Sequence, residues 1–191
     1  MAIVGQSIEN PVNGERIEWV ETAASTSGAL LSFDLVLRPG AAVAARHRHL
    51  RQDEHFRVRA GRVGVEVGGQ EASFGPGEET VAPAGVAHRW WNAGAEQAIV
   101  RVALRPALDT ETFFETLFGL ARDGKTNAKG IPGLLQIAAT VHELGDSCSC
   151  LDRPPVAVQR AAAALLAPVA RLLGRHATYE RYSPRDETRD A

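Results

Sequence analysis

Two stretches of the chain decide its fold: residues 40–61, GAAVAARHRHLRQDEHFRVRAG, and residues 77–92, GEETVAPAGVAHRWWN. In an extended strand the side chains alternate between two faces, so His47 and His49 share one face. Glu54 follows on the next extended segment, after four residues. The first stretch therefore offers two imidazoles and a carboxylate to one site.

The second stretch supplies a third imidazole. His88, Trp90 and Asn92 alternate with Arg89 and Trp91, so one face of this strand again holds a histidine. Neutral imidazoles and a carboxylate suit a divalent ion of intermediate softness, such as Fe(II), Mn(II), Ni(II), Cu(II) or Zn(II). The sequence therefore predicts one divalent transition metal per chain, in a site with positions left open for water or substrate.

The spacing of these residues resembles the two signature motifs of the cupin superfamily. In the first motif one step departs from the family pattern, because six residues rather than five separate Gly40 from His47. Every position of the second motif is present: Gly77, Pro83, Gly85, His88 and Asn92. A pattern of this length is far more specific than a short motif, and the resemblance covers residues 30–104.

The resemblance implies a mainly β fold, the double-stranded β-helix or jelly roll of a single-barrel cupin, with a C-terminal α-helical extension. Carried over residue by residue, it also implies four metal ligands: His47, His49, Glu54 and His88. A purely structural role for the histidines is the alternative. The resemblance to flavonol-cleaving, quercetin-dioxygenase-like cupins further implies Glu54 as a catalytic general base.

Apolar residues that share the inward faces predict a largely apolar pocket: Phe56, Val58, Val65 and Trp90. Of these, Phe56, Val58 and Trp90 are the expected substrate-binding residues. The main hypothesis is a metal-dependent oxygenase, an oxidoreductase of the dioxygenase kind, acting on a small enolisable or aromatic substrate. Two alternatives stay open: an O2-independent isomerase, cyclase or lyase that uses the metal as a Lewis acid, and a non-catalytic cupin that binds a small ligand.

Composition limits the possible partners. The 191 residues suffice for one domain with an appendage, and 45% hydrophobic and 23% charged residues are ordinary for a globular protein. A formal net charge of -2 gives no electrostatic reason to expect nucleic acid. The N-terminus lacks the basic and apolar regions of a secretory signal, so we expect a cytoplasmic protein.

Short apolar runs separated by glycine, proline and asparagine predict a closed or sandwiched antiparallel sheet up to Arg105. Gly68 and Gly69 predict a hairpin turn. The expected strands span residues 16–21, 30–37, 44–49, 54–60, 62–67, 70–74, 80–82, 88–92 and 97–104.

After Pro106 the apolar period becomes helical. Asp109 is the expected N-cap of the first helix and Gly124 its expected stop. The expected helices span residues 110–122, 132–144 and 156–173. The sequence thus predicts a cupin barrel over 1–105, a helical extension over 106–178 and a polar, disordered tail over 179–191.

Several roles are open to the extension. It can cover the barrel mouth, mediate dimerisation, or serve only as a packing appendage, and Phe113, Phe114 and Phe118 can line a substrate entrance. Arg160, Arg171 and Pro168 interrupt its most apolar helix, so we expect no membrane span. The cupin resemblance suggests a homodimer.

The remaining polar residues carry weaker expectations. Alternation aims Arg46 and Arg48 away from the metal. Asn92 is expected to anchor a turn through its side chain. Cys148 and Cys150 are expected to be reduced loop residues, because vicinal cysteines with one intervening residue form at best a strained disulfide.

Overall fold

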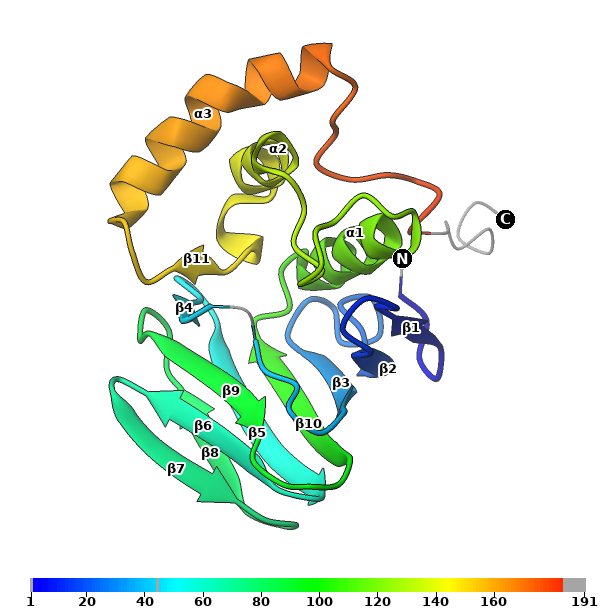
Figure 1. Ribbon diagram of the computed structural model, residues 1–191, viewed down its shortest axis with the longest axis vertical. Helices are drawn as coiled ribbons and strands as arrows, with labels where there is room; N and C mark the ends of the chain where they lie inside the picture. Colours follow the sequence, from blue (N-terminus) through cyan, green and yellow to red (C-terminus); the bar gives the residue numbers. More distant parts are fainter. Residues whose placement is uncertain (1, 44, 184–191) are drawn as a thin grey trace.

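The computed structural model describes residues 2–43 and 45–183, which form a β-barrel with a stack of helices at one end (Figure 1). The strands are β1 (Ser7–Glu9), β2 (Arg16–Glu21), β3 (Leu31–Leu37), β4 (His47–Arg48), β5 (Asp53–Ala60), β6 (Val63–Val67), β7 (Gln70–Phe74), β8 (Glu79–Ala82), β9 (His88–Asn92), β10 (Ala98–Arg105) and β11 (Cys150–Leu151).

Two antiparallel sheets make the barrel. One has the strand order β1-β2-β3-β10-β5-β8 and the other the order β11-β4-β9-β6-β7. Consecutive strands alternate between the sheets along much of the chain, as in a jelly roll. The mainly β, jelly-roll fold expected from the sequence is confirmed.

The hairpin between β6 and β7 is confirmed as well. Gly68 and Gly69 connect the strands in two residues and have φ angles of 59° and 90°. Positive φ at both central positions of a two-residue turn suits the right-handed twist of the flanking strands, and glycine adopts it without a steric cost.

The core lies between the two sheets. Aromatic and aliphatic side chains from the inward positions of both sheets are almost fully buried there, among them Trp19, Phe33, Phe56 and Leu104. Trp19 and Phe33 meet edge to face, with ring centroids 5.6 Å apart. This packing makes a rigid scaffold on which strand ends can hold polar side chains.

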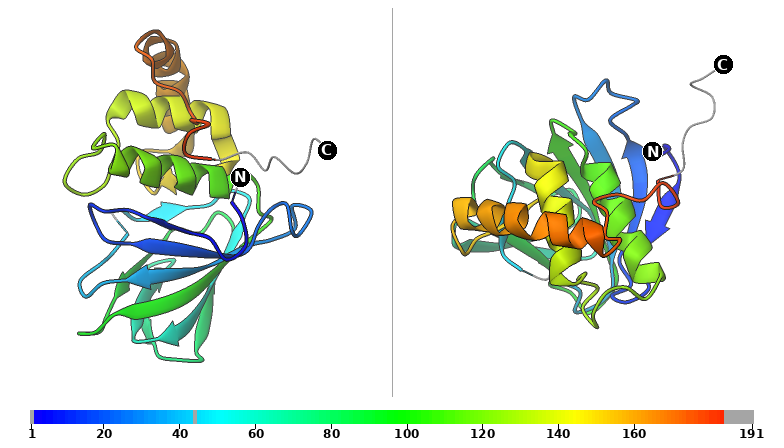
Figure 2. Two further views of the ribbon diagram at one scale, coloured as in Figure 1. Left: turned by 90° about the vertical axis from the view of Figure 1, so that its right-hand side faces the viewer. Right: turned by 90° about the horizontal axis from the view of Figure 1, so that it is seen from above.

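The helices are α1 (Thr110–Arg122), α2 (Leu134–Leu144) and α3 (Val156–Leu172), with a 3-10 turn η1 (Gly145–Ser147) after α2. Figures 1 and 2 show α1 next to the barrel, α2 beyond it and α3 outermost. Helix α1 matches its expected bounds, but Asp109 does not cap it through its side chain. The Asp109 carboxylate instead accepts a hydrogen bond from Ser147 Oγ at 3.2 Å.

Phe114 and Phe118 of α1 attach the extension to the barrel. Phe118 is buried in the core, and Phe114 meets Phe33 edge to face with centroids 5.4 Å apart. These two side chains therefore pack the extension against the sheet rather than line an entrance.

Three features differ from the expected elements. Strands β1 and β11 are additional, and β4 is only two residues long. The expected β4 also included Ala44, which lies outside the described residues. Strands this short carry too few alternating side chains to be recognised from sequence.

The expectation of a disordered tail is wrong for residues 179–183. Tyr182 is buried, packs over Gly119 of α1 and donates a hydrogen bond of 2.6 Å to Asp123. Tyr179 donates one of 2.8 Å to Gln136 of α2. Two tyrosines thus tie this segment to the helices, whereas residues 184–191 of the expected tail lie outside the described residues.

None of the helices within residues 2–43 and 45–183 combines the length and the apolar character needed to cross a membrane.

Candidate metal centre

Four side chains from three strands and the residue after β4 meet in one cluster. Figure 1 shows β4 at the end of the barrel that faces the helices. β4 and the residue after it supply His47 and His49, β5 supplies Glu54 and β9 supplies His88. Their possible ligand atoms all lie within 4.8 Å of one another, and all four residues are buried. The strand pairing explains the meeting, because His47 and His88 are direct partners of β4 and β9.

Backbone carbonyls orient two of the imidazoles. His47 Nδ1 lies 3.1 Å from the carbonyl oxygen of Ala45, and His88 Nδ1 lies 2.9 Å from that of Val86. A carbonyl only accepts hydrogen bonds, so each Nδ1 carries the proton and each Nε2 is directed towards the cluster. Such anchoring of the distal ring nitrogen fixes the tautomer of metal-binding histidines.

His49 differs from the other two histidines. Its Nδ1 is buried without a hydrogen-bond partner in the described part of the chain. Its Nε2 lies 3.3 Å from Glu54 Oε2. Within the described residues, the ring of His49 is therefore oriented through Nε2, by its contact with Glu54.

Glu54 is the centre of the cluster. Its Oε2 lies 2.8 Å from His88 Nε2 as well as 3.3 Å from His49 Nε2. Burial works to raise the pKa of the Glu54 carboxyl, but the hydrogen bonds and charges of His49 and His88 outweigh burial and hold this pKa well below its ordinary value. Glu54 is therefore a carboxylate at neutral pH.

The histidines respond to burial and to Glu54 in different ways. Burial lowers the pKa of His47 to about 4, so this imidazole is neutral at neutral pH. Burial also acts to lower the pKa of His88, but its hydrogen bond and the charge of Glu54 raise it overall. Two donated hydrogen bonds, to Val86 and to Glu54, agree with a protonated His88.

The cluster can hold a metal ion. Bonds of about 2.0–2.2 Å to nitrogen and oxygen would place the donors within about 4.4 Å of one another, so small side-chain movements suffice. The donor set of three imidazoles and one carboxylate also matches divalent transition metals. These observations support the four expected ligands without identifying the ion.

The expected substrate-binding residues lie on the inner faces of the barrel. Phe56 and Val58 are each 2% exposed and Trp90 is 9% exposed. The Phe56 ring meets the ring of His88 edge to face, with centroids 6.2 Å apart. Phe56 therefore lies beside the cluster, and all three side chains belong to the hydrophobic core.

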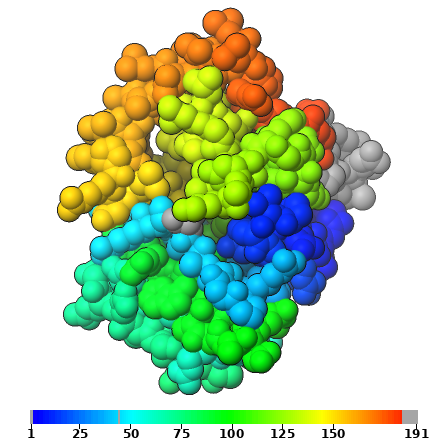
Figure 3. Space-filling model, in the orientation of Figure 1, coloured from blue at the N-terminus to red at the C-terminus, as the bar shows by residue number. Residues whose placement is uncertain are grey.

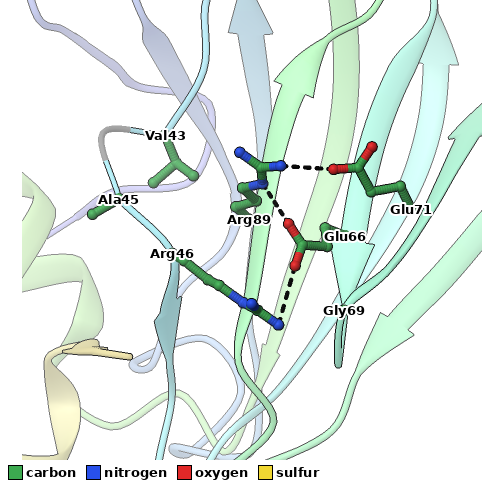
Figure 4. Close-up of a pocket in the computed structure, with 7 residues that line it drawn as sticks. All are labelled: Val43, Ala45, Arg46, Glu66, Gly69, Glu71 and Arg89. Atoms are coloured by element: carbon green, nitrogen blue, oxygen red, sulfur yellow. Dashed lines mark hydrogen bonds and ion pairs between the residues drawn. The ribbon is translucent and has the colours of Figure 1, made fainter. Parts of the chain in front are cut away.

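The outer face of the strands that carry His47 and His88 holds a network of ion pairs (Figure 4). The buried carboxylate of Glu66 pairs with two arginines: Arg46 Nη2 lies 3.0 Å from its Oε1 and Arg89 Nε lies 2.5 Å from its Oε2. Arg89 Nη2 also lies 2.6 Å from Glu71 Oε1. The network borders a shallow hollow of about 610 Å³ on the surface. The hollow lies on the opposite face of the sheet from the cluster, so it is separate from the candidate metal centre.

Asn92 anchors the end of β9, as expected. Its amide nitrogen donates to the carbonyls of Leu37, Arg38 and Glu96, and its side-chain oxygen accepts from Gly94 N. The side chain thus links three segments of backbone at the edge of the barrel.

Sequence reasoning missed one element of the site. Strand β11 pairs with β4, so Leu151 lies opposite His47 and Cys150 opposite Arg48. Cys150 therefore belongs to a strand and not to a loop, although both cysteines are free thiols as expected. A two-residue strand has no period of its own, and the distance of about a hundred residues from β4 left no local signal.

Residues 33–104 match the family model described as Cupin domain. A curated protein of Hypocrea virens, "Probable oxidoreductase virH", is 28% identical over 116 residues, which are 57% of this chain and 51% of that protein. The chain therefore spans about half the length of this relative.

Solved structures similar to this chain include three bacterial proteins. KdgF from a Halomonas species is 23% identical, with a TM-score of 0.43 over 48% of this chain and 78% of that one. A protein described as a predicted oxalate decarboxylase from Thermotoga maritima is 18% identical, with a TM-score of 0.47 over 55% of this chain and 93% of that one. The protein TT1209 from Thermus thermophilus is 34% identical, with a TM-score of 0.39 over 41% of this chain and 74% of that one.

Proposed function

We propose that the protein is a metal-dependent cupin oxygenase acting on a small enolisable or aromatic substrate, in keeping with the match of residues 33–104 to the Cupin domain model. The observation that carries the proposal is the buried cluster of His47, His49, Glu54 and His88. The similarity to a probable oxidoreductase supports the redox character of the reaction.

A bound divalent ion of this ligand set would supply Lewis acidity and, if redox-active, electron transfer to O2. The protein contributes the orientation of the imidazoles through Ala45 and Val86 and a carboxylate at Glu54. Glu54 is the carboxylate that would hold a substrate proton, once a bound ion had drawn His49 and His88 away from Oε2, because those two contacts keep the pKa of Glu54 low.

The surroundings support an apolar substrate. Phe56 lies beside His88, and Val58 and Trp90 continue the apolar interior of the barrel. Burial of the four candidate ligands excludes most water, which strengthens electrostatic interactions in the site. A flat or aliphatic molecule with a chelating enol, diol or acid matches this combination.

The first test measures metal content in purified wild type and in two variants. We expect near-stoichiometric metal in wild type and a loss of affinity greater than about 100-fold in His88→Ala, since changes outside the ligand shell already cost about 10- to 100-fold. His55→Ala is the matched control, because this imidazole lies outside the cluster and the variant should keep its metal. A wild type that stays empty after anaerobic reconstitution with all five candidate ions contradicts the proposal.

Oxygen dependence separates the oxygenase from the second candidate, an isomerase, cyclase or lyase that uses the same ion as a Lewis acid. Substrates with enol or aromatic groups should consume O2 only when the metal is present. Turnover that continues unchanged under anaerobic conditions would favour the Lewis-acid enzyme. Stable binding of a metal and a small ligand without any turnover would favour the binding protein.

Other expectations stay predictions: the barrel, extension and tail divided at residues 105 and 178, a cytoplasmic location, and a homodimer.

A further inference from the structure

The helical extension contributes a strand to the barrel directly beside the candidate metal centre. β11 pairs antiparallel with β4, the strand that carries His47. Figures 1 and 3 show the gold segment around residue 150 resting on the cyan segment around residue 47. The rim of the barrel at the cluster is therefore built from two parts of the chain about a hundred residues apart.

The register decides which side chain of β11 faces the cluster. Leu151 lies opposite His47, and directly opposed residues of an antiparallel pair project to the same face, with Cβ atoms about 4.5–5.5 Å apart. Since the His47 side chain belongs to the buried cluster, the register places Leu151 on the same face of the sheet as His47. Cys150 shares the outer face with Arg48.

Leu151 is nevertheless 48% exposed, while His47 beside it is 7% exposed. An inward-facing side chain that still contacts solvent marks a rim that is open at this point. Leu151 is thus a half-exposed apolar side chain on the strand next to His47, and it lies outside the hydrophobic core.

The backbone of Leu151 is held on both edges of β11. On the outer edge, Gln159 of α3 accepts a hydrogen bond from Leu151 N at 3.1 Å and donates one to Leu151 O at 2.8 Å. On the inner edge, Asp152 N donates to Arg46 O at 3.1 Å, and the Asp152 carboxylate pairs with Arg48. A side chain on backbone fixed in this way is preorganised, as specificity-determining contacts require.

We propose that Leu151 forms the outer wall of the substrate site at the metal, so that the extension sets the size of the molecule that reaches His47, His49 and His88. This inference rests on the proposed function, because it assigns specificity at the same metal centre. It concerns access from solvent, which the side chain of Leu151 controls without contributing a ligand atom.

The test compares two probes of different size on the cobalt(II)-loaded protein. Azide is small, whereas 2-naphthohydroxamate is a bulky chelator, and binding of either shifts the visible absorption bands of cobalt. Leu151→Trp should weaken the naphthohydroxamate by at least about tenfold, or roughly 1.4 kcal/mol, while azide stays within about twofold. Leu151→Ala should not weaken either probe, because it removes bulk from the rim.

Leu134→Trp is the matched control, since Leu134 is a 69% exposed leucine on α2 that lies outside the sheet. Its two affinities should equal those of wild type. The proposal is overturned if Leu151→Trp leaves naphthohydroxamate unchanged or weakens azide equally. If the wild type gives no cobalt spectrum, the proposed metal centre itself is wrong. If the wild type binds cobalt but Leu151→Trp binds both probes as wild type does, only the proposal for Leu151 is wrong.

Discussion

His88 makes metal binding and proton binding compete at one nitrogen. In the cluster its Nε2 lies 2.8 Å from Glu54 Oε2, and the interaction with Glu54 raises the pKa of His88 despite the opposing effect of burial. A ligand nitrogen must be free of its proton, so a metal that binds here releases the proton of His88. The raised pKa favours retention of this proton in the metal-free protein.

Metal affinity should therefore rise with pH until the pH exceeds the pKa of His88. The slope should be up to about tenfold per pH unit for each proton released. His47 adds to this dependence only in acid, because burial lowers its pKa to about 4. Calorimetry in buffers of different ionisation enthalpy counts the released protons. His55→Ala should leave the count unchanged, and an affinity equal at pH 6 and pH 8 contradicts the expectation.

Individual residues of the site were predictable where a motif fixes both type and spacing. The four candidate ligands lie on strands or directly after one, and the structure brings them into one buried cluster. Asn92, also expected from the motif, anchors the other end of β9. Leu151 and Tyr182 were not predictable, because their places depend on a long-range strand pair and on a packing contact with Gly119. Neither contact leaves a periodic pattern in the sequence.

At the scale of elements, the Tyr182 ring packs where a side chain at Gly119 of α1 would lie. A Cβ added at Gly119 would lie 2.3 Å from Cγ of Tyr182, so the two residues fit only because one has no side chain. Gly119→Ala should destabilise the protein by about 1–3 kcal/mol through this overpacking. Urea denaturation measures the loss.

The same substitution should stabilise the protein, not destabilise it, once the Tyr182 ring is removed. In a Tyr182→Ala background, Gly119→Ala no longer meets an aromatic ring, and the helix gains about 1 kcal/mol from the propensity of alanine. Destabilisation of equal size in both backgrounds would show that Tyr182 does not occupy the position described.

Long elements were easier to predict than short ones. The bounds of α1 and β9 agree with the periodic pattern, because many residues repeat the same period. Strand β11 was missed, and Asp109 stands at the start of α1 but interacts with Ser147 instead of capping the helix. Tertiary partners decided these cases, and they are not visible in a local window of sequence.

At the scale of the whole molecule, α3 offers a surface for the predicted homodimer. Large apolar side chains recur along its outer face at positions Val158, Leu165, Val169 and Leu172, which are 53%, 77%, 46% and 88% exposed. The opposite face packs its alanines against α2. Arg160 and Arg171, the charged residues of α3, pair with Asp146 and Glu143 of the same chain.

A second copy suits this face better than an anionic surface, because intramolecular pairs already neutralise both arginines. The apolar stripe follows steps of seven, four and three residues, which keep it on one face of a helix about 25 Å long, as in helix pairs. Leu165→Glu with Leu172→Glu should convert a dimer to a monomer in light scattering. A dimer that survives both changes would place the contact elsewhere, and Arg175→Glu serves as a charge control outside the stripe.

The pairing of β11 with β4 has a consequence for biosynthesis. The edge of β4 can close only after residue 151 has left the ribosome, about a hundred residues after His47. At translation rates of about 5–20 residues per second, the edge beside a metal ligand stays open for about 5–20 s. An open edge is a template for pairing with other chains, so the nascent barrel passes through a period of exposure to aggregation and chaperones that ends when the extension arrives.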